Sequence, residues 1–248
     1  MQNRYVGDVG DFAKYSLLRA LLGQSRLRLG IVWYLFADES HNMDGLHTSY
    51  LQRSEFRKLD PELHDRLSRI VRSGRRSVRS IFQAEIFPPD TLFFDLPIAP
   101  PSHVRAARET HEAYRTKWLS SALAATAGCD LVFLDPDNGL ETRSIRKHAP
   151  RAGKYVFWDE LESFWDRGQS LVVYHHLNRS ASVEEQTKVL RKTFRAQFAA
   201  AEEIICLLFR RGSCRHFWIV GQTAHASTLR KRINAMIDSG WGGYLEIA

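Results

Sequence analysis

The chain has 248 residues, of which 44% are hydrophobic and 25% charged, and its formal net charge is +7. This composition is that of a folded domain, and it excludes disordered, collagen-like and coiled-coil chains. The apolar runs are far shorter than the roughly 18 to 20 residues that cross a bilayer, and the N-terminus lacks the apolar stretch of a secretory signal. We expect a cytoplasmic protein with no membrane partner. The positive charge favours an anionic partner such as nucleic acid, RNA or DNA.

Apolar spacing and capping residues predict helices and strands in alternation along the chain. The first helix begins at Asp8 or Asp11 and ends at Gly23, and a capping Asp60 followed by Pro61 begins the next. The last two strands are joined by a linker short enough to force an antiparallel hairpin. We expect helices over 8–22, 60–70, 104–125, 155–165, 182–201 and 227–238, and strands over 27–36, 91–96, 130–134, 170–175, 203–209 and 215–221.

This alternation predicts one α/β domain over residues 1–248, with a mainly parallel sheet between two layers of helices. The hairpin near the C-terminus is also the ending of the class I methyltransferase fold, a Rossmann-like three-layer sandwich. We interpret the arginine-rich helical segment at about 44–90 as an insertion into this domain. Sheets of this type bind their ligands outside the carboxyl ends of the strands.

The most informative motif follows the buried strand 130–134, where the chain reads Asp135-Pro136-Asp137-Asn138-Gly139. The motif resembles the (Asp/Asn/Ser)-Pro-Pro-aromatic motif of nucleic-acid amino-group methyltransferases. In that family the first side chain and a nearby proline carbonyl accept hydrogen bonds from the exocyclic amine. The resemblance implies that Asp135 and Pro136 are catalytic and that Asn138 completes the pocket. The alternative interpretation is a turn whose residues satisfy their own backbone.

A second motif, Gly7 to Tyr15, stands at the start of the first helix. It resembles the N-terminal segment of the J-type large-subunit ribosomal RNA adenine-N6 methyltransferases, with a glycine, an aspartate and a lysine spaced as Gly7, Asp11 and Lys14 are. The resemblance implies S-adenosylmethionine as cofactor, an adenine amino group as target, a catalytic Lys14 and a cofactor-binding Asp11. Helix capping with a surface ion pair is the alternative.

The chain departs from that family in the loop after the first strand, which we expect to wrap the cofactor. A single glycine, Gly45, remains in the segment 36–45, where the family is glycine-rich. Asp137 and Asn138 also replace the family's second proline and its base-stacking aromatic. The residues of this loop assigned to the cofactor are Phe36, Ala37 and Asp38.

Substrate-binding residues are expected among arginines spaced mostly three apart, among aromatic rings near the strand ends, and at a histidine pair. Arginine suits phosphate because its planar guanidinium offers paired donors. The alternative interpretation of this arginine pattern is a solvent-exposed helix face. Adjacent strand residues point to opposite faces, so only one of His175 and His176 can face the site. The residues assigned to the substrate are Arg69, Arg72, Arg75, Arg76, Trp158, Tyr174 and His175.

Two other functions use the same residues. Asp135, Asp137 and Glu141 would suit Mg²⁺ in a metal-dependent nuclease or phosphodiesterase, since this ion prefers carboxylate oxygens. A catalytically inactive RNA- or DNA-binding module on the same fold is the third hypothesis. Phosphate-binding Gly-rich motifs and the Gly-x-Ser-x-Gly nucleophile motif are absent from the sequence, which argues against P-loop hydrolases and α/β-hydrolases.

Overall fold

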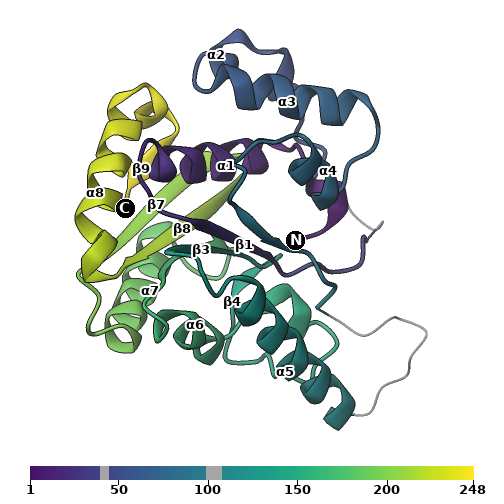
Figure 1. The fold of residues 1–248 in the computed structure, drawn as a ribbon, viewed down its shortest axis with the longest axis vertical. Helices are drawn as coiled ribbons and strands as arrows, with labels where there is room; N and C mark the ends of the chain where they lie inside the picture. The colour runs from purple at the N-terminus through teal and green to yellow at the C-terminus, as the bar shows by residue number, and fades with distance from the viewer. Residues whose placement is uncertain (40–44, 99–107) are drawn as a thin grey trace.

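The computed structural model describes residues 1–39, 45–98 and 108–248. Its core is a seven-stranded sheet with the strand order β2-β1-β3-β6-β8-β7-β9, and layers of helices cover both faces (Figure 1). The strands are β1 (Leu29–Trp33), β2 (Leu92–Phe94), β3 (Leu131–Asp135), β6 (Ser170–His176), β7 (Glu203–Arg211), β8 (Ser213–Gly221) and β9 (Leu245–Ile247). A separate two-stranded sheet pairs β4 (Gly139–Leu140) with β5 (Tyr155–Val156).

The helices belong to two layers with separate hydrophobic cores. α1 and α8 pack on one face of the sheet, with α3 packed on α1, and α5, α6 and α7 cover the other face (Figure 1). The α-helices are α1 (Val9–Leu22), α2 (Ser54–Arg57), α3 (Pro61–Arg72), α4 (Val78–Gln83), α5 (Arg108–Ala125), α6 (Trp158–Trp165), α7 (Val183–Gln197) and α8 (Thr223–Asp238). Among the described residues, no helix is long and apolar enough to cross a membrane.

The sheet confirms the predicted Rossmann-like α/β fold. β2, β1, β3 and β6 are parallel, while β8 is antiparallel to both β6 and β7. From β1 the chain moves first to β2 on one side and then to β3 on the other, so the direction of winding reverses between β1 and β3. In sheets of this type, the crevice at the carboxyl ends of the two strands flanking that reversal is where ligands bind.

Capping residues explain why several helices begin where they do. The Asp8 side chain accepts the backbone N–H of Asp11 at the start of α1, and Asp60 accepts that of Leu63 at the start of α3. These bonds satisfy donors that the first helical turn leaves unpaired. α1 ends at Gly23, whose φ of 46° is one that glycine adopts without strain.

Some predicted boundaries were wrong because pairing across the structure overrides the local pattern. The helix expected over 155–165 begins only at Trp158, since Tyr155–Val156 pairs with β4. α3 ends at Arg72 and a separate α4 follows, so the arginines do not share one long helix. The tail after α8 adds β9, an edge strand that was not predicted. Residues 104–107 of the helix expected before Arg108 lie outside the described residues.

Candidate functional site

A cavity of about 340 Å³ opens at the carboxyl ends of β3 and β6, beside the first turn of α1. The turn between β7 and β8 closes its far side, and the first residues of the chain form part of its wall. The cavity brings together five of the residues predicted to be catalytic or cofactor-binding, from two distant parts of the sequence. They are Asp11, Lys14, Asp135, Pro136 and Asn138.

Lys14 links α1 to the end of β3 through two buried ion pairs. Its Nζ lies 2.7 Å from Asp11 Oδ1 and 2.7 Å from Asp135 Oδ2, and the three side chains are 5%, 1% and 2% exposed. Burial opposes the charge on Lys14, but the two carboxylates raise its pKa well above the usual value. Burial also raises the pKa of Asp11 to about 6, against the opposing effect of Lys14. A buried lysine cation therefore bridges Asp11 and Asp135.

The turn after β3 presents hydrogen-bond acceptors to the cavity. No described residue donates to Asp135 Oδ1, to the Pro136 carbonyl or to the Asn138 side-chain amide, and all three residues line the cavity. Gly139 follows with a φ of 104°, and a Cβ there would lie 2.4 Å from His175 Nδ1. A glycine is therefore required for the turn to pass under β6.

Met1 fills the crevice between β1 and β3. Its amino group donates to the carbonyls of Tyr34, at 2.9 Å, and Asp135, at 3.2 Å, and its carbonyl accepts the N–H of Phe36 at 2.9 Å. The thioether sulfur lies 3.6 Å from Lys14 Nζ, and the residue is 2% exposed. Burial lowers the pKa of this amino group, against the nearby carboxylates of Asp137 and Asp135. The crevice between β1 and β3, where the direction of winding reverses, thus holds the amino group and the sulfur of a methionine.

Gln2 and Lys154 bind two further carboxylates beside Met1, those of Glu39 and Asp137. Gln2 is fully buried and donates to Asp137 Oδ2 at 2.8 Å and to Glu39 Oε2 at 3.1 Å. Lys154 Nζ lies 2.5 Å from Glu39 and 3.5 Å from Asp137. Burial opposes ionisation of Asp137, but the Met1 amino group, Gln2 and Lys154 lower its pKa below the usual value.

The loop predicted to bind the cofactor runs beside the N-terminal residues. Phe36 is bonded to Met1 through its backbone, and its ring lies 5.4 Å from Lys154 Nζ. Asp38 Oδ1 accepts the backbone N–H of Arg4. Neither these two residues nor Ala37 lines the cavity next to Asp135. Residues 40–44 of this loop lie outside the described residues.

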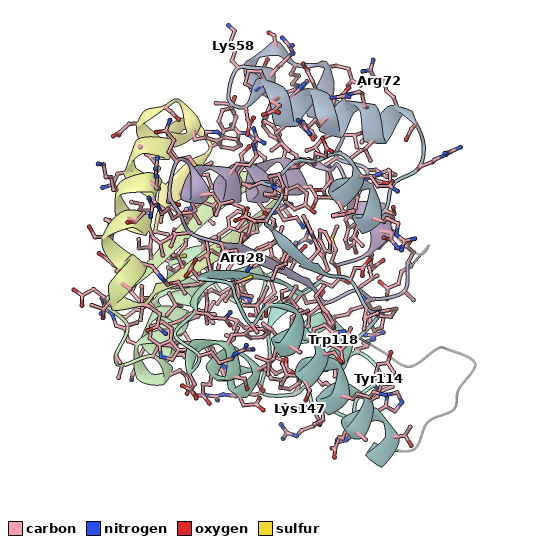
Figure 2. The ribbon with its side chains drawn as sticks, viewed as in Figure 1. Arg28, Lys58, Arg72, Tyr114, Trp118 and Lys147 are labelled. Atoms are coloured by element: carbon pink, nitrogen blue, oxygen red, sulfur yellow. The ribbon has the colours of Figure 1, made fainter. Side chains whose placement is uncertain are left out.

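The predicted arginines divide into two groups. Arg76 turns inward and donates to the carbonyls of Val6 and Gly45, each at 2.6 Å, so it fixes the chain next to the cavity. Arg69 and Arg72 lie exposed on α3, and Figure 2 shows Arg72 on the outer side of that helix. Arg75 is exposed in the turn that follows. An exposed basic surface therefore borders the inward-facing Arg76.

The aromatic and histidine candidates do not all reach the cavity. Tyr174 lines it, as does His176, whereas His175 faces the other side of β6 and accepts the N–H of Leu140 through Nδ1. Burial lowers the pKa of His175 to about 3, so this ring is neutral. The Trp158 ring packs edge-on against Phe194, with centroids 4.9 Å apart, and does not line the cavity.

The carboxylates considered for a metal ion have other partners. Glu141 Oε1 accepts the backbone N–H of Trp158 at 3.0 Å, and Asp137 is held by Gln2 and Lys154. Within the described part of the chain, no group of three or more histidine, cysteine or acidic side chains is placed to hold a metal ion. The described residues therefore offer no ligand set for the nuclease hypothesis.

Sequence reasoning did not identify Met1, Gln2, Lys154 or Arg215 as parts of the site. The first three are brought there by long-range contacts that leave no local pattern. Arg215 did carry a signal, because it begins the predicted strand 215–221 and arginine is seldom buried without a reason.

Comparison with known proteins adds no relative. No protein-family model matches the chain, and neither does any curated protein. The function is therefore inferred from the geometry of the site.

Proposed function

We propose that the protein is an S-adenosylmethionine-dependent methyltransferase that acts on an amino group of nucleic acid, with adenine as the preferred base. One juxtaposition carries the proposal. Between the ends of β1 and β3, backbone carbonyls hold the amino group of a methionine, and the end of β3 presents to an adjoining cavity acceptors that have no donor among the described residues. A methyl donor and an amine acceptor would meet at Asp135.

The crevice fits the methionine end of the proposed cofactor. S-adenosylmethionine carries the same α-amino group as Met1 and supplies a methyl group on a positively charged sulfur. The carbonyls of Tyr34 and Asp135 would accept from its amino group, as they now accept from Met1. Asp95, directly after β2, is half-buried and has no hydrogen bond or ion pair within the described residues, which suits a ribose hydroxyl.

The cofactor and Met1 cannot occupy the crevice together, so binding requires Met1 to leave. Its contacts are a few hydrogen bonds to backbone groups, the approach of its sulfur to Lys14, the attraction of its amino group to Asp135 and Asp137, and the burial of one apolar side chain. A net hydrogen bond contributes about 0.5–1.5 kcal/mol, so exchange for a ligand with the same groups is energetically accessible. We expect the N-terminal residues to compete with the cofactor.

The residues around the cavity would orient the target amine. Asp135 Oδ1 and the Pro136 carbonyl would accept its N–H groups, which leaves the nitrogen lone pair directed at the crevice. Lys14 holds Asp135 in place through Oδ2. S-adenosylmethionine would supply the methyl group to this nitrogen, and Asp135 Oδ1 would accept the surplus proton of the amine and release it to solvent. Tyr174 lines the cavity and would contact a base turned into it.

The test is radiolabelled methyl transfer onto single-stranded RNA and DNA. We expect Asp135→Ala to lower transfer by about 10²–10³-fold, the scale for losing one preorganised contact to a reacting group. Asp135→Asn should retain part of the activity, because an amide oxygen still accepts from the amine. Asp90→Asn is the matched control. Asp90 is an exposed aspartate before the amino end of β2, whereas the cavity lies at the carboxyl ends of the strands.

Unfolding midpoints of all variants show whether a loss reflects folding. If Asp135→Ala fails to fold, Asn138→Ala replaces it, because the Asn138 side chain has no hydrogen-bond partner among the described residues. An active Asp135→Ala protein would contradict the proposal. Binding of nucleic acid without any transfer would support the inactive binding module instead.

A further inference from the structure

The proposed amine site occupies one end of the cavity, and the opposite wall has a different chemistry. Arg215 lies there at the start of β8, 5% exposed, and Arg179 stands exposed at the rim. Among the described residues, no carboxylate lies within ion-pair distance of either guanidinium. Lys14, by contrast, is already paired with two carboxylates. This wall therefore carries two guanidinium groups without an ion pair among the described residues, and the nearest carboxylate, that of Asp8, lies next to Arg215 at the start of α1.

The Arg215 guanidinium is only partly hydrogen-bonded. Nη2 donates to Ser213 Oγ at 2.7 Å, but the buried Nε has no partner and nothing described accepts from Nη1. A buried donor without an acceptor costs free energy, so an absent acceptor is the expected explanation. The guanidinium carbon lies 5.7 Å from the Phe209 ring centroid, a contact that positions the fork without using its donors.

The first turn of α1 is adapted to this arginine. A Cβ at Gly10 would lie 1.4 Å from Arg215 Nη1, so the missing side chain of this glycine leaves room for the guanidinium in its present position. The Gly10 N–H itself has no acceptor among the described residues, and Gly10 lines the cavity. Asp8 also lines the cavity, but its Oδ1 caps the helix through the Asp11 N–H. Free donors at a helix N-terminus attract anions.

We propose that this wall binds a backbone phosphate of a single-stranded nucleic acid, through Arg215, Arg179 and the Gly10 N–H. The inference rests on the proposed function and names how its substrate is held. A phosphate on this wall would leave the attached nucleotide directed at Asp135, with Tyr174 beside it. Arginine offers paired donors for two phosphate oxygens, which fixes orientation as well as affinity.

The test measures binding of a fluorescently labelled single-stranded oligonucleotide by anisotropy over a range of KCl concentrations. Each lost phosphate contact lowers the slope of log K against log salt by about 0.7 for single strands. We expect this reduction, with about a tenfold or greater loss of affinity, for Arg215→Met and for Arg179→Met. Arg215→Lys should keep the slope because it keeps the charge.

Arg28→Met is the matched control, because Arg28 lies just before the amino end of β1 and does not line the cavity at the carboxyl ends of the strands; Figure 2 labels it. Arg179→Met guards against misfolding, since Arg179 is exposed and has no ion pair with a described residue. An unchanged slope in both methionine variants, or no binding by the wild type, would overturn the inference. Slope loss without methyl transfer would keep the phosphate site and reject the proposed function. Methyl transfer with an unchanged slope would keep the proposed function and reject the phosphate site.

Discussion

Replacing Lys14 with methionine is the most direct test of how the site is held together. The variant leaves Asp11 and Asp135 buried without their shared cation. At 2.7 Å, each attraction is worth about 6 kcal/mol at an effective dielectric constant of 20. Desolvation cancels much of this, and breaking a buried ion pair costs about 3–5 kcal/mol in measured cases. We expect a loss of that size in the free energy of unfolding at pH 7.

The loss should shrink on acidification. Without Lys14, which opposes the effect of burial, the pKa of Asp11 rises further above its value in the unfolded chain. A group with a raised folded pKa stabilises the protein at low pH and loses that contribution as the pH rises through the folded pKa. The difference between wild type and Lys14→Met is therefore smaller at pH 5 than at pH 7.

Urea unfolding followed by tryptophan fluorescence at the two pH values measures both effects. Lys147→Met serves as the control, because Lys147 pairs with Asp159 at the surface and such pairs are worth about 0–1 kcal/mol. A loss below about 1 kcal/mol at pH 7 for Lys14→Met, or a loss that is the same at pH 5, would refute the electrostatic account.

Other predictions concern the shell around the site. The folded pKa of His175 is about 3 against 6.5 in the unfolded chain, so stability falls as the pH drops from 6.5 towards 3. From pH 7 to pH 5 the wild type should lose about 2 kcal/mol more than His175→Asn in urea titrations, and equal losses would be inconsistent with a neutral buried ring. Gly139→Ala should lower stability by about 1–3 kcal/mol, because φ is positive and the new Cβ meets His175; an unchanged melting temperature would show that the turn adapts. Arg115→Met should cost about 3–5 kcal/mol by stranding the buried Glu160, and adding Glu160→Gln should restore much of it in a double-mutant cycle.

Local signals predicted much of the fold. Asp8 and Asp60 mark helix starts because capping is a short-range interaction, and the run before Asp135 marks β3 because buried parallel strands are continuously apolar. These elements and their order suffice to predict a mainly parallel sheet. β9 was missed because its three residues carry no alternation of their own and are a strand only through pairing with β7.

The site was only partly predictable. Asp135 and Lys14 were identified from separate motifs, and the structure joins them at 2.7 Å. Met1 was not, since its place depends on carbonyl groups that every residue possesses. Arg76 was interpreted as part of a basic stripe, but the end of α3 at Arg72 turns it towards the Val6 and Gly45 carbonyls. Backbone acceptors leave no trace in a sequence pattern, so such contacts require the fold.

Calorimetric titration with S-adenosylmethionine tests the central claim most directly, applied to the intact chain and to a variant that lacks Met1 and Gln2. We expect saturable binding to both, with higher affinity for the shortened variant, because the crevice between β1 and β3 is then free of the competing methionine. Absence of binding to both forms, with the shortened variant still folded, would contradict the proposal that this crevice holds the methyl donor.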